Sequence, residues 1–274
     1  NLVEPALIIS AIFVNATAVA DGSAMQAAFG WWLAAPARFP RATYIGKTDD
    51  DSFVHIPRLL AHLGGLACEE TTGGGRALYA GHLQFTTPNP KKAEGCTIWA
   101  NNFEEAQELY VKRGCAALGA SPPVPFAIGA LQVASRQLAG WVASSVQVRR
   151  AAAATIDEAD CAGGGSTQDK PACRLEDAYT GQWMSRAPLA VSYVRMSWRL
   201  VHALRCHVKH SRLHPSNVPT NASVAIHKLK RRGALEYLWR LYGNGSWHNA
   251  RAHESAACWE LAFGKERLAK AVRE

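Results

Sequence analysis

The sequence YIGKTDDDSFVHIPRLLAHL, Tyr44–Leu63, joins a strand, an acidic turn and a helix in direct succession. Its apolar start predicts a buried strand over Ala42–Gly46, and the apolar spacing after the turn predicts a helix over Ile56–Leu63. Strands that alternate with helices are typical of α/β folds. We therefore expect an α/β fold, and the same alternation continues along the chain.

The acidic turn Asp49-Asp50-Asp51 places consecutive carboxylates at the end of the predicted strand. Their mutual repulsion is costly unless a cation or solvent compensates it. In an extended turn, residues i and i+2 project to the same side, so Asp49 and Asp51 are expected to face one site. Carboxylate oxygens suit Mg²⁺ or Mn²⁺, and such an ion bridges a diphosphate. The alternative for an isolated Asp-x-Asp is a solvated acidic turn.

The rest of the chain repeats the strand and helix patterns. Further strands are expected at Ala6–Val14, Ala77–His82, Gly129–Ala134, Leu189–Met196 and Ser223–His227. Further helices are expected at Ala24–Leu33, Phe103–Leu118, Ser135–Ser145, Asp177–Ser185 and Gly233–Tyr242.

The length of 274 residues, with 48% of them hydrophobic, fits the core of one large domain or two small ones. We predict a single domain over residues 1–274, because no long polar linker interrupts the apolar pattern. Exposed loops are expected at Glu69–Gly75 and at Thr155–Cys173, and the second is interpreted as an insertion within the domain.

The formal charge of +8 comes from basic clusters late in the chain, at Arg195–Lys209, Lys228–Arg232 and Lys265–Arg273. A polyanionic partner is one interpretation, and nucleotide diphosphates are polyanions too. No helix-turn-helix, zinc-finger or RNA-binding signature accompanies the clusters, so a solvated basic face is preferred and no nucleic-acid partner is expected.

The seven cysteines form no CxxC pair, which argues against a zinc ribbon, and their odd number leaves at least one thiol unpaired. Three glycosylation sequons, at Asn15, Asn221 and Asn244, favour a secretory lumen. No apolar run is long enough to span a bilayer. Because the chain starts with Asn1 rather than Met, we expect any membrane anchor in a segment upstream of it.

Residues 44–63 resemble the signature of the β-1,3-galactosyltransferase family, family 31 of the glycosyltransferases, in which K-x-D-D-D-x-F-V precedes a Pro-Leu-Leu helix. Two further blocks follow in the family's order. The segment Pro122–Leu138 resembles the block P-P-Y-C-S-G-G-G-Y-V-L-S-R-D-L, and Glu176–Gly181 (EDAYTG) resembles E-D-V-Y-x-G. Ser223–Leu229 is similar to the stretch with the family's late metal-binding histidine.

The resemblance implies the GT-A nucleotide-sugar fold, a mixed central sheet flanked by helices. It also implies inverting, Mn²⁺-dependent transfer of a hexose, galactose or N-acetylglucosamine, from a UDP-sugar to a glycan hydroxyl through a β-1,3 bond; Mg²⁺ is the alternative ion. The family's location is the Golgi lumen. Because only 48 residues precede Asp49, part of the amino-terminal nucleotide-binding unit is expected to be missing.

The resemblance also assigns roles to single residues. Asp51, Asp49 and His227 are the implied metal ligands, and Asp177 is the implied general base. The residues implied at the donor sugar nucleotide are Lys47, Asp49, Asp50, Gly129 and Glu176. Two alternatives stay open from the residues alone: His227 as a satisfied polar side chain, and Glu176-Asp177 as an acidic helix start.

The sequence departs from the family at the second block, where only Gly129 remains of three glycines, so a reshaped sugar pocket is expected. Pro125 and Trp183 stand where the family often has cysteines. A non-catalytic carbohydrate-binding or structural remnant of the same fold is therefore the alternative function. The short amino-terminal region favours that remnant, whereas the complete triplet together with Asp177 favours the enzyme.

Overall fold

The computed structural model describes residues 24–70, 77–87, 96, 98–158, 176–203, 219–220, 222–227, 229 and 238. The chain divides into two compact units. Asn1–Lys47, Arg76–Ile128 and Val133–Val194 form the first unit, and Thr48–Gly75, Gly129–Gln132 and Arg195–Glu274 form the second. Each unit is described by itself.

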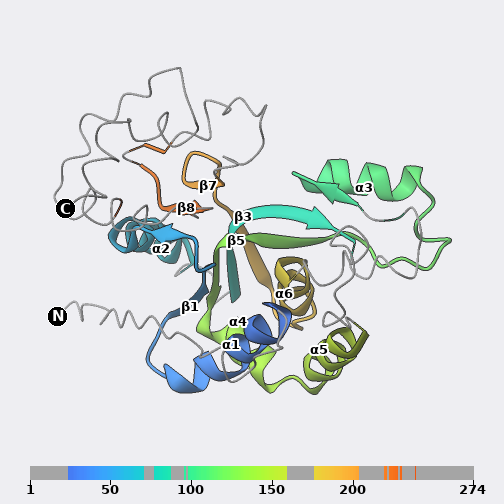
Figure 1. Cartoon of the computed structure of the whole chain (residues 1–274), viewed down its shortest axis with the longest axis horizontal. Coiled ribbons are helices and arrows are strands. Elements are labelled where there is room, and N and C mark those ends of the chain that lie inside the picture. The colour runs from blue at the N-terminus through green and yellow to red at the C-terminus, as the bar shows by residue number, and fades with distance from the viewer. Residues whose placement is uncertain are drawn as a thin grey trace. The chain divides into compact units, whose positions relative to one another are not determined.

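The first unit is built on a five-stranded sheet (Figure 1). Its strands are β1 (Tyr44–Lys47), β3 (Ala77–Thr86), β4 (Trp99–Ala100), β5 (Val124–Ser135) and β6 (Val191–Arg195), although Gly129–Gln132 of β5 and Arg195 of β6 are assigned to the second unit. The order is β1-β5-β3-β4, and β6 also pairs with β3. β3 is almost continuously buried, as expected for a strand at the centre of a sheet.

Helices α1 (Ala24–Arg38), α4 (Arg136–Ser144), α5 (Val146–Glu158) and α6 (Glu176–Ser185) form one core with this sheet. Figure 1 shows α1, α4 and α5 side by side. Trp32 of α1 and Trp183 of α6 are fully buried in this core. Burying a large side chain contributes roughly 1.5–3 kcal/mol, so these tryptophans stabilise the packing of α1 and α6 in the core. α4 starts at its N-cap Ser135, whose hydroxyl accepts the N–H of Leu138.

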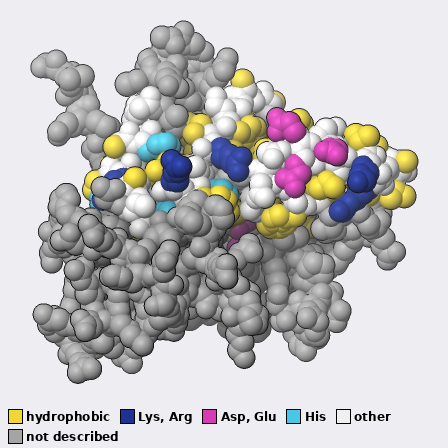
Figure 2. Space-filling view, turned by 90° about the horizontal axis from the view of Figure 1, so that it is seen from above, with side chains coloured by type: hydrophobic (Ala, Val, Ile, Leu, Met, Phe, Trp, Pro, Cys, Tyr) yellow, Lys and Arg dark blue, Asp and Glu magenta, His cyan; other side chains and the backbone are white. Residues whose placement is uncertain are grey.

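Helix α3 (Phe103–Lys112) packs with β4 in a smaller core of its own. Its N-cap is Asn102, whose side chain accepts the N–H of Glu105, and the Glu105 carboxylate accepts the N–H of Asn101. A disulfide joins Cys96 to Cys115 in this core. Figure 2 shows hydrophobic and acidic side chains mixed on the exposed side of α3.

The second unit contains a three-stranded mixed sheet and helix α2 (Ile56–Glu70). Its strands are β2 (Phe53–Val54), β7 (Val201–Ala203) and β8 (Ala225–His227), in the order β2-β8-β7. β2 pairs antiparallel with β8, with Phe53 opposite Ile226, and β7 pairs parallel with β8. β8 is the central strand of this sheet, and its last residue is His227.

The chain therefore has the expected mixed α/β architecture of strands flanked by helices. The strands at Ala42–Gly46, Ala77–His82, Gly129–Ala134, Leu189–Met196 and Ser223–His227 and five of the expected helices lie where predicted, with shifted ends. The predictions at Ala6–Val14 and, apart from Leu238, at Gly233–Tyr242 lie outside the described residues. The single-domain organisation stays a prediction.

Some predicted boundaries are wrong. α3 ends at Lys112 instead of Leu118, because Gly114 adopts a left-handed conformation (φ 61°) that ends a helix. α2 extends through Glu70 into the loop predicted from Glu69, and α5 extends to Glu158, into the loop predicted from Thr155. None of the helices in the described part of the chain is long and apolar enough to cross a membrane.

Candidate functional site

The acidic triplet begins in a turn that backbone hydrogen bonds hold in place in the second unit. The Thr48 hydroxyl donates to the carbonyl of Ala130 (2.8 Å), and the N–H of Asp49 donates to the carbonyl of Gly129 (2.9 Å). The N–H of Ser52 donates back to the carbonyl of Asp49 at 3.1 Å. This turn is therefore tied to Gly129–Gln132, a segment far away in the sequence.

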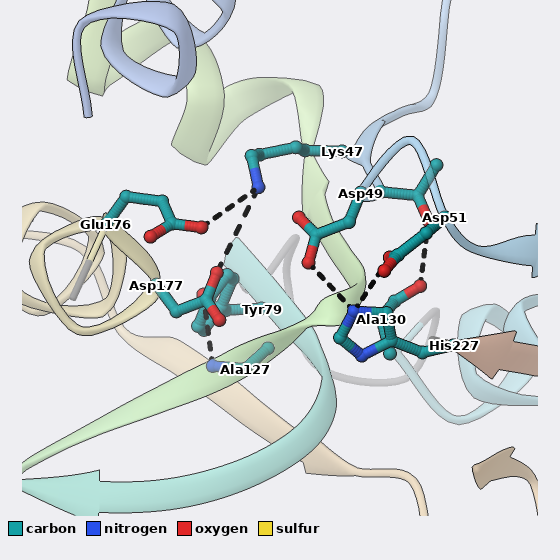
Figure 3. A network of polar contacts seen from close by, with 10 residues as sticks. Lys47, Asp49, Asp51, Tyr79, Ala127, Ala130, Glu176, Asp177 and His227 are labelled. Atoms are coloured by element: carbon teal, nitrogen blue, oxygen red, sulfur yellow. Dashed lines mark hydrogen bonds and ion pairs between the residues drawn. The ribbon is translucent and has the colours of Figure 1, made fainter. Parts of the chain in front are cut away.

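His227 lies next to the triplet because β8 pairs with β2, the strand that follows the triplet. The N–H of Leu229 donates to the carbonyl of Asp51 (2.8 Å), which fixes the chain just beyond β8. Nε2 of His227 is 3.2 Å from Oδ2 of Asp49 and 3.0 Å from Oδ1 of Asp51. Figure 3 shows the imidazole pointing at both carboxylates. The predicted ligands Asp49, Asp51 and His227 thus come together.

These side chains have a donor set that suits a divalent ion. Their ligand atoms all lie within 4.8 Å of one another. In an octahedral site with bonds of about 2.1 Å, neighbouring ligand atoms are roughly 3.0 Å apart, which matches the two distances to Nε2. Two carboxylate oxygens and one imidazole nitrogen suit Mn²⁺. The side chains of Asp49, Asp51 and His227 are 26%, 18% and 14% exposed, so an ion has access from solvent.

Asp50 stands apart from this cluster: it is exposed, and the cluster found among the described residues consists of its two neighbours and His227. The alternation expected for an extended turn explains this difference. Its predicted role at the donor stays a prediction.

Gly129 leaves the space that the Asp49 carboxylate occupies. A Cβ at this position would lie 2.6 Å from Cγ of Asp49, which is closer than side chains approach. The family resemblance implied a role for Gly129 at the donor sugar nucleotide. The structure gives the small size of this residue a physical reason, since the glycine admits a candidate metal ligand.

Lys47, Glu176 and Asp177 form a second polar group, which lies in the first unit. Nζ of Lys47, at the end of β1, is 4.0 Å from Oε1 of Glu176 and 4.0 Å from Oδ1 of Asp177 (Figure 3). The two acidic residues open α6, where the helix dipole favours negative charge. The Asp177 side chain is 21% exposed, so solvent reaches the carboxylate proposed as a base. The helix-start interpretation is correct, and it leaves the catalytic role open.

Tyr79 lies beside Asp177 and was not predicted as a site residue. It is fully buried in β3, and its hydroxyl accepts the N–H of Ala127 at 3.2 Å. Burial raises the pKa of Tyr79 far above its usual value, and the negative charge of Asp177 raises it further. The phenol therefore stays protonated. A tyrosine inside an apolar strand looks like core in a sequence, so no signal marks its position next to Asp177.

Within the described part of the chain, these two groups of side chains are the candidates for a functional site. One group offers two carboxylates and an imidazole at metal-ligand spacing, and the other offers a partly exposed carboxylate held beside an ammonium. A scan against protein-family models finds no match to the chain, and a search of curated proteins finds none either.

Proposed function

We propose that the chain is an inverting, metal-dependent glycosyltransferase of the GT-A type, which transfers a hexose from a UDP-sugar to a glycan hydroxyl. The observation that carries this proposal is the position of His227, whose Nε2 lies 3.2 Å from Oδ2 of Asp49 and 3.0 Å from Oδ1 of Asp51. Both aspartates belong to the K-x-D-D-D sequence that starts at Lys47. Galactose or N-acetylglucosamine as the sugar, a β-1,3 linkage and the Golgi lumen belong to the same proposal, and they follow from the sequence resemblance.

In this proposal Asp49, Asp51 and His227 hold Mn²⁺, or Mg²⁺ in its place. Bound there, the ion neutralises charge on the leaving diphosphate. Asp50, Gly129 and Glu176 keep the roles at the donor that the resemblance implies. The exposure of Asp50 suits contact with a ribose hydroxyl or with metal-bound water.

Asp177 serves as the general base. Its carboxylate accepts the proton of the acceptor hydroxyl while that oxygen attacks the anomeric carbon from the face opposite the diphosphate. The new C–O bond forms as the bond to the phosphate oxygen breaks, and the electron pair leaves with UDP. A single displacement of this kind inverts the anomeric centre and needs no covalent nucleophile.

Lys47 serves as the ion-pair partner of this base. The resemblance implied a role for Lys47 at the donor, and the ion pairs suggest a more local task. An ammonium 4.0 Å from both Glu176 and Asp177 compensates part of the charge of the two neighbouring carboxylates and favours their ionised forms.

A second candidate is a carbohydrate-binding remnant without catalysis. The distances of 3.0 and 3.2 Å also suit direct ion pairs from a protonated His227, which would hold β8 to the triplet with no metal. Among the described residues, the buried Nδ1 of His227 has no hydrogen-bond partner, whereas metal-binding histidines usually have one there.

The experiment that separates the candidates is turnover of a panel of UDP-sugars with Mn²⁺ or with a chelator. We expect hydrolysis or transfer with one sugar, dependent on the metal, and a loss of roughly 10²- to 10⁴-fold in Asp177→Asn with UDP binding kept. Glu108→Gln, which removes an exposed charge on α3, is the control and should leave turnover unchanged. No turnover with any sugar would favour the remnant, whereas turnover that a chelator leaves unchanged would contradict the metal site.

A further inference from the structure

Trp99 is exposed although it is one of the largest apolar side chains of the chain. It lies in the edge strand β4 and is 49% exposed. Its inner side packs against Phe126 of β5, with ring centroids 4.9 Å apart and an interplanar angle of 74°. Phe126 itself is fully buried. One part of the indole is therefore anchored while the rest faces solvent.

The strand that carries Trp99 is held by several independent contacts. The hydroxyl of Thr86, the residue opposite Trp99 in the β3–β4 ladder, donates to the carbonyl of Ile98 at 2.7 Å. The hydroxyl of Thr87 donates to the carbonyl of Cys96 and accepts the N–H of Ile98. Cys96 is also tied to Cys115 by the disulfide. A rigid mount of this kind lowers the entropy lost when the ring binds a ligand.

Two amide side chains share the sheet face of Trp99: Asn101 is exposed, whereas Gln84 is buried, with 6% of it exposed. Gln84 precedes Thr86 by two residues, so it shares the face of the ladder on which Trp99 lies. Its Nε2 donates to Oδ1 of Asn101 at 3.3 Å. Amides both donate and accept hydrogen bonds, as sugar hydroxyls do.

The same surface is connected to α6, whose first turn contains the proposed base Asp177. A Cβ on Gly181 of α6 would lie 2.7 Å from Cα of Phe126, so the helix backbone touches the residue that supports Trp99. Gly181 follows Asp177 by four residues and therefore lies on the same side of α6. The ring, its support and Asp177 thus belong to one contiguous part of the first unit.

We propose that Trp99 and Asn101 form a subsite for the acceptor saccharide, in which a pyranose ring stacks its C–H face on the indole and hydrogen-bonds to the Asn101 amide, while the buried Gln84 holds that amide in place. This proposal rests on the proposed function, since it names the acceptor side of that reaction. The ligand class is a neutral pyranoside. A protein partner fits less well, because an interface needs a much larger apolar area than one indole face flanked by an amide.

The test measures saccharide binding without donor or metal. Methyl β-galactoside, methyl β-N-acetylglucosaminide and lactose are titrated by NMR into the full chain, into Trp99→Leu and into Trp99→Phe. We expect Trp99→Leu, which keeps apolar bulk against Phe126, to weaken binding about tenfold, whereas Trp99→Phe keeps most of it. Phe103→Ala is the matched control, since Phe103 is 50% exposed and packs on Phe85, whose ladder partner is Ala100 rather than Trp99.

Wild-type protein that binds none of the saccharides, or that binds them equally after Trp99→Leu, overturns the subsite. The same holds if Phe103→Ala weakens binding as much as Trp99→Leu does. If Trp99→Leu still turns over UDP-sugars with an unchanged acceptor KM, the subsite proposal is wrong and the proposed function stands. If Trp99→Leu loses saccharide binding and the wild type turns over no UDP-sugar, the subsite proposal stands and the proposed function is wrong.

Discussion

The Asp49 carboxylate lies in the space that a side chain at residue 129 would occupy, so Gly129 is part of the candidate metal site. Alanine at residue 129 would push the Asp49 carboxylate away from its position 3.2 Å from Nε2 of His227. We expect Gly129→Ala to lower Mn²⁺ affinity by roughly 10- to 100-fold, as changes in the shell around metal ligands do. Calorimetric titration with Mn²⁺ measures this effect.

Gly140→Ala is the control for that variant. A Cβ on Gly140 of α4 meets nothing within 4 Å, so alanine there should leave Mn²⁺ affinity unchanged and stabilise the helix by about 0.5–1 kcal/mol. Equal Mn²⁺ affinity in both variants and the wild type would show that the Asp49 carboxylate is not a ligand in this position.

His55 should make the stability depend on pH. Its pKa is lowered by burial and by the charge of Arg58, and its Nδ1 accepts the N–H of Arg58 at 3.3 Å, which requires the unprotonated ring. The unfolded chain, with a pKa of about 6.5, takes up this proton at a higher pH than the folded chain does. The stabilisation is therefore present above about pH 6.5 and is lost as the pH falls below it.

Urea unfolding at about pH 7.5 and about pH 5.5 measures this dependence, with the two values chosen on either side of the unfolded pKa. We expect the loss of unfolding free energy between them to be smaller in His55→Gln than in the wild type, because glutamine does not titrate. An equal or larger loss in His55→Gln would mean that His55 does not resist protonation.

The candidate site was only partly readable from the sequence. The triplet and His227 were found because the resemblance placed them in order, and Asp49 and Asp51 share a side because of the alternation of an extended chain. The ion pairs of Lys47 with α6 and the position of Tyr79 beside Asp177 depend on which strands and helices become neighbours. A single sequence contains no signal for such contacts.

Helix α6 and strand β5 approach each other at a glycine, Gly181. A Cβ on Gly181 would lie 2.7 Å from Cα of Phe126, which is too close for the strand to remain in place. We expect Gly181→Ala to lower the unfolding free energy by roughly 1–2 kcal/mol, because overpacking outweighs the gain in helix propensity. In Gly30→Ala of α1, where a Cβ meets nothing within 4 Å, urea unfolding should show no loss. Equal stability of both variants would contradict the close contact.

The Cys96–Cys115 disulfide stabilises the small core between β4 and α3. It closes a loop with a sequence separation of 19 residues, which corresponds to about 3 kcal/mol by loop entropy. We expect a double variant, Cys96→Ser with Cys115→Ser, to melt at a lower temperature and to lose the sensitivity to reductant that comes from this bond. A melting temperature that neither the substitutions nor a reductant changes would contradict this role.

The elements that the sequence missed have physical reasons in common. β2 and β4 have two residues each and β7 has three, so none is long enough to show a period of two. Helix α5 ends in Asp157 and Glu158, two acidic residues that look like the start of an exposed loop in the sequence. The cysteine pairing was not predictable either, because an odd number of cysteines leaves many pairings open.

The whole chain is proposed to hold a divalent-metal site that binds a nucleotide diphosphate. The net charge of +8 does not test this claim, because most residues of the basic clusters lie outside the described part of the chain. The claim depends on Asp49, Asp51 and His227 binding one ion together. Removal of any one of these ligands should therefore weaken metal binding.

The most direct measurement is calorimetric titration of the whole chain with Mn²⁺, followed by UDP, for the wild type, Asp51→Asn, His227→Gln and the exposed-charge control Glu108→Gln. We expect one Mn²⁺ per wild-type and control chain, UDP binding only when Mn²⁺ is present, and at least roughly tenfold weaker Mn²⁺ binding in the other two variants. Wild-type chain that binds no Mn²⁺, or binds it as tightly after Asp51→Asn and His227→Gln, would contradict the metal site and the function built on it.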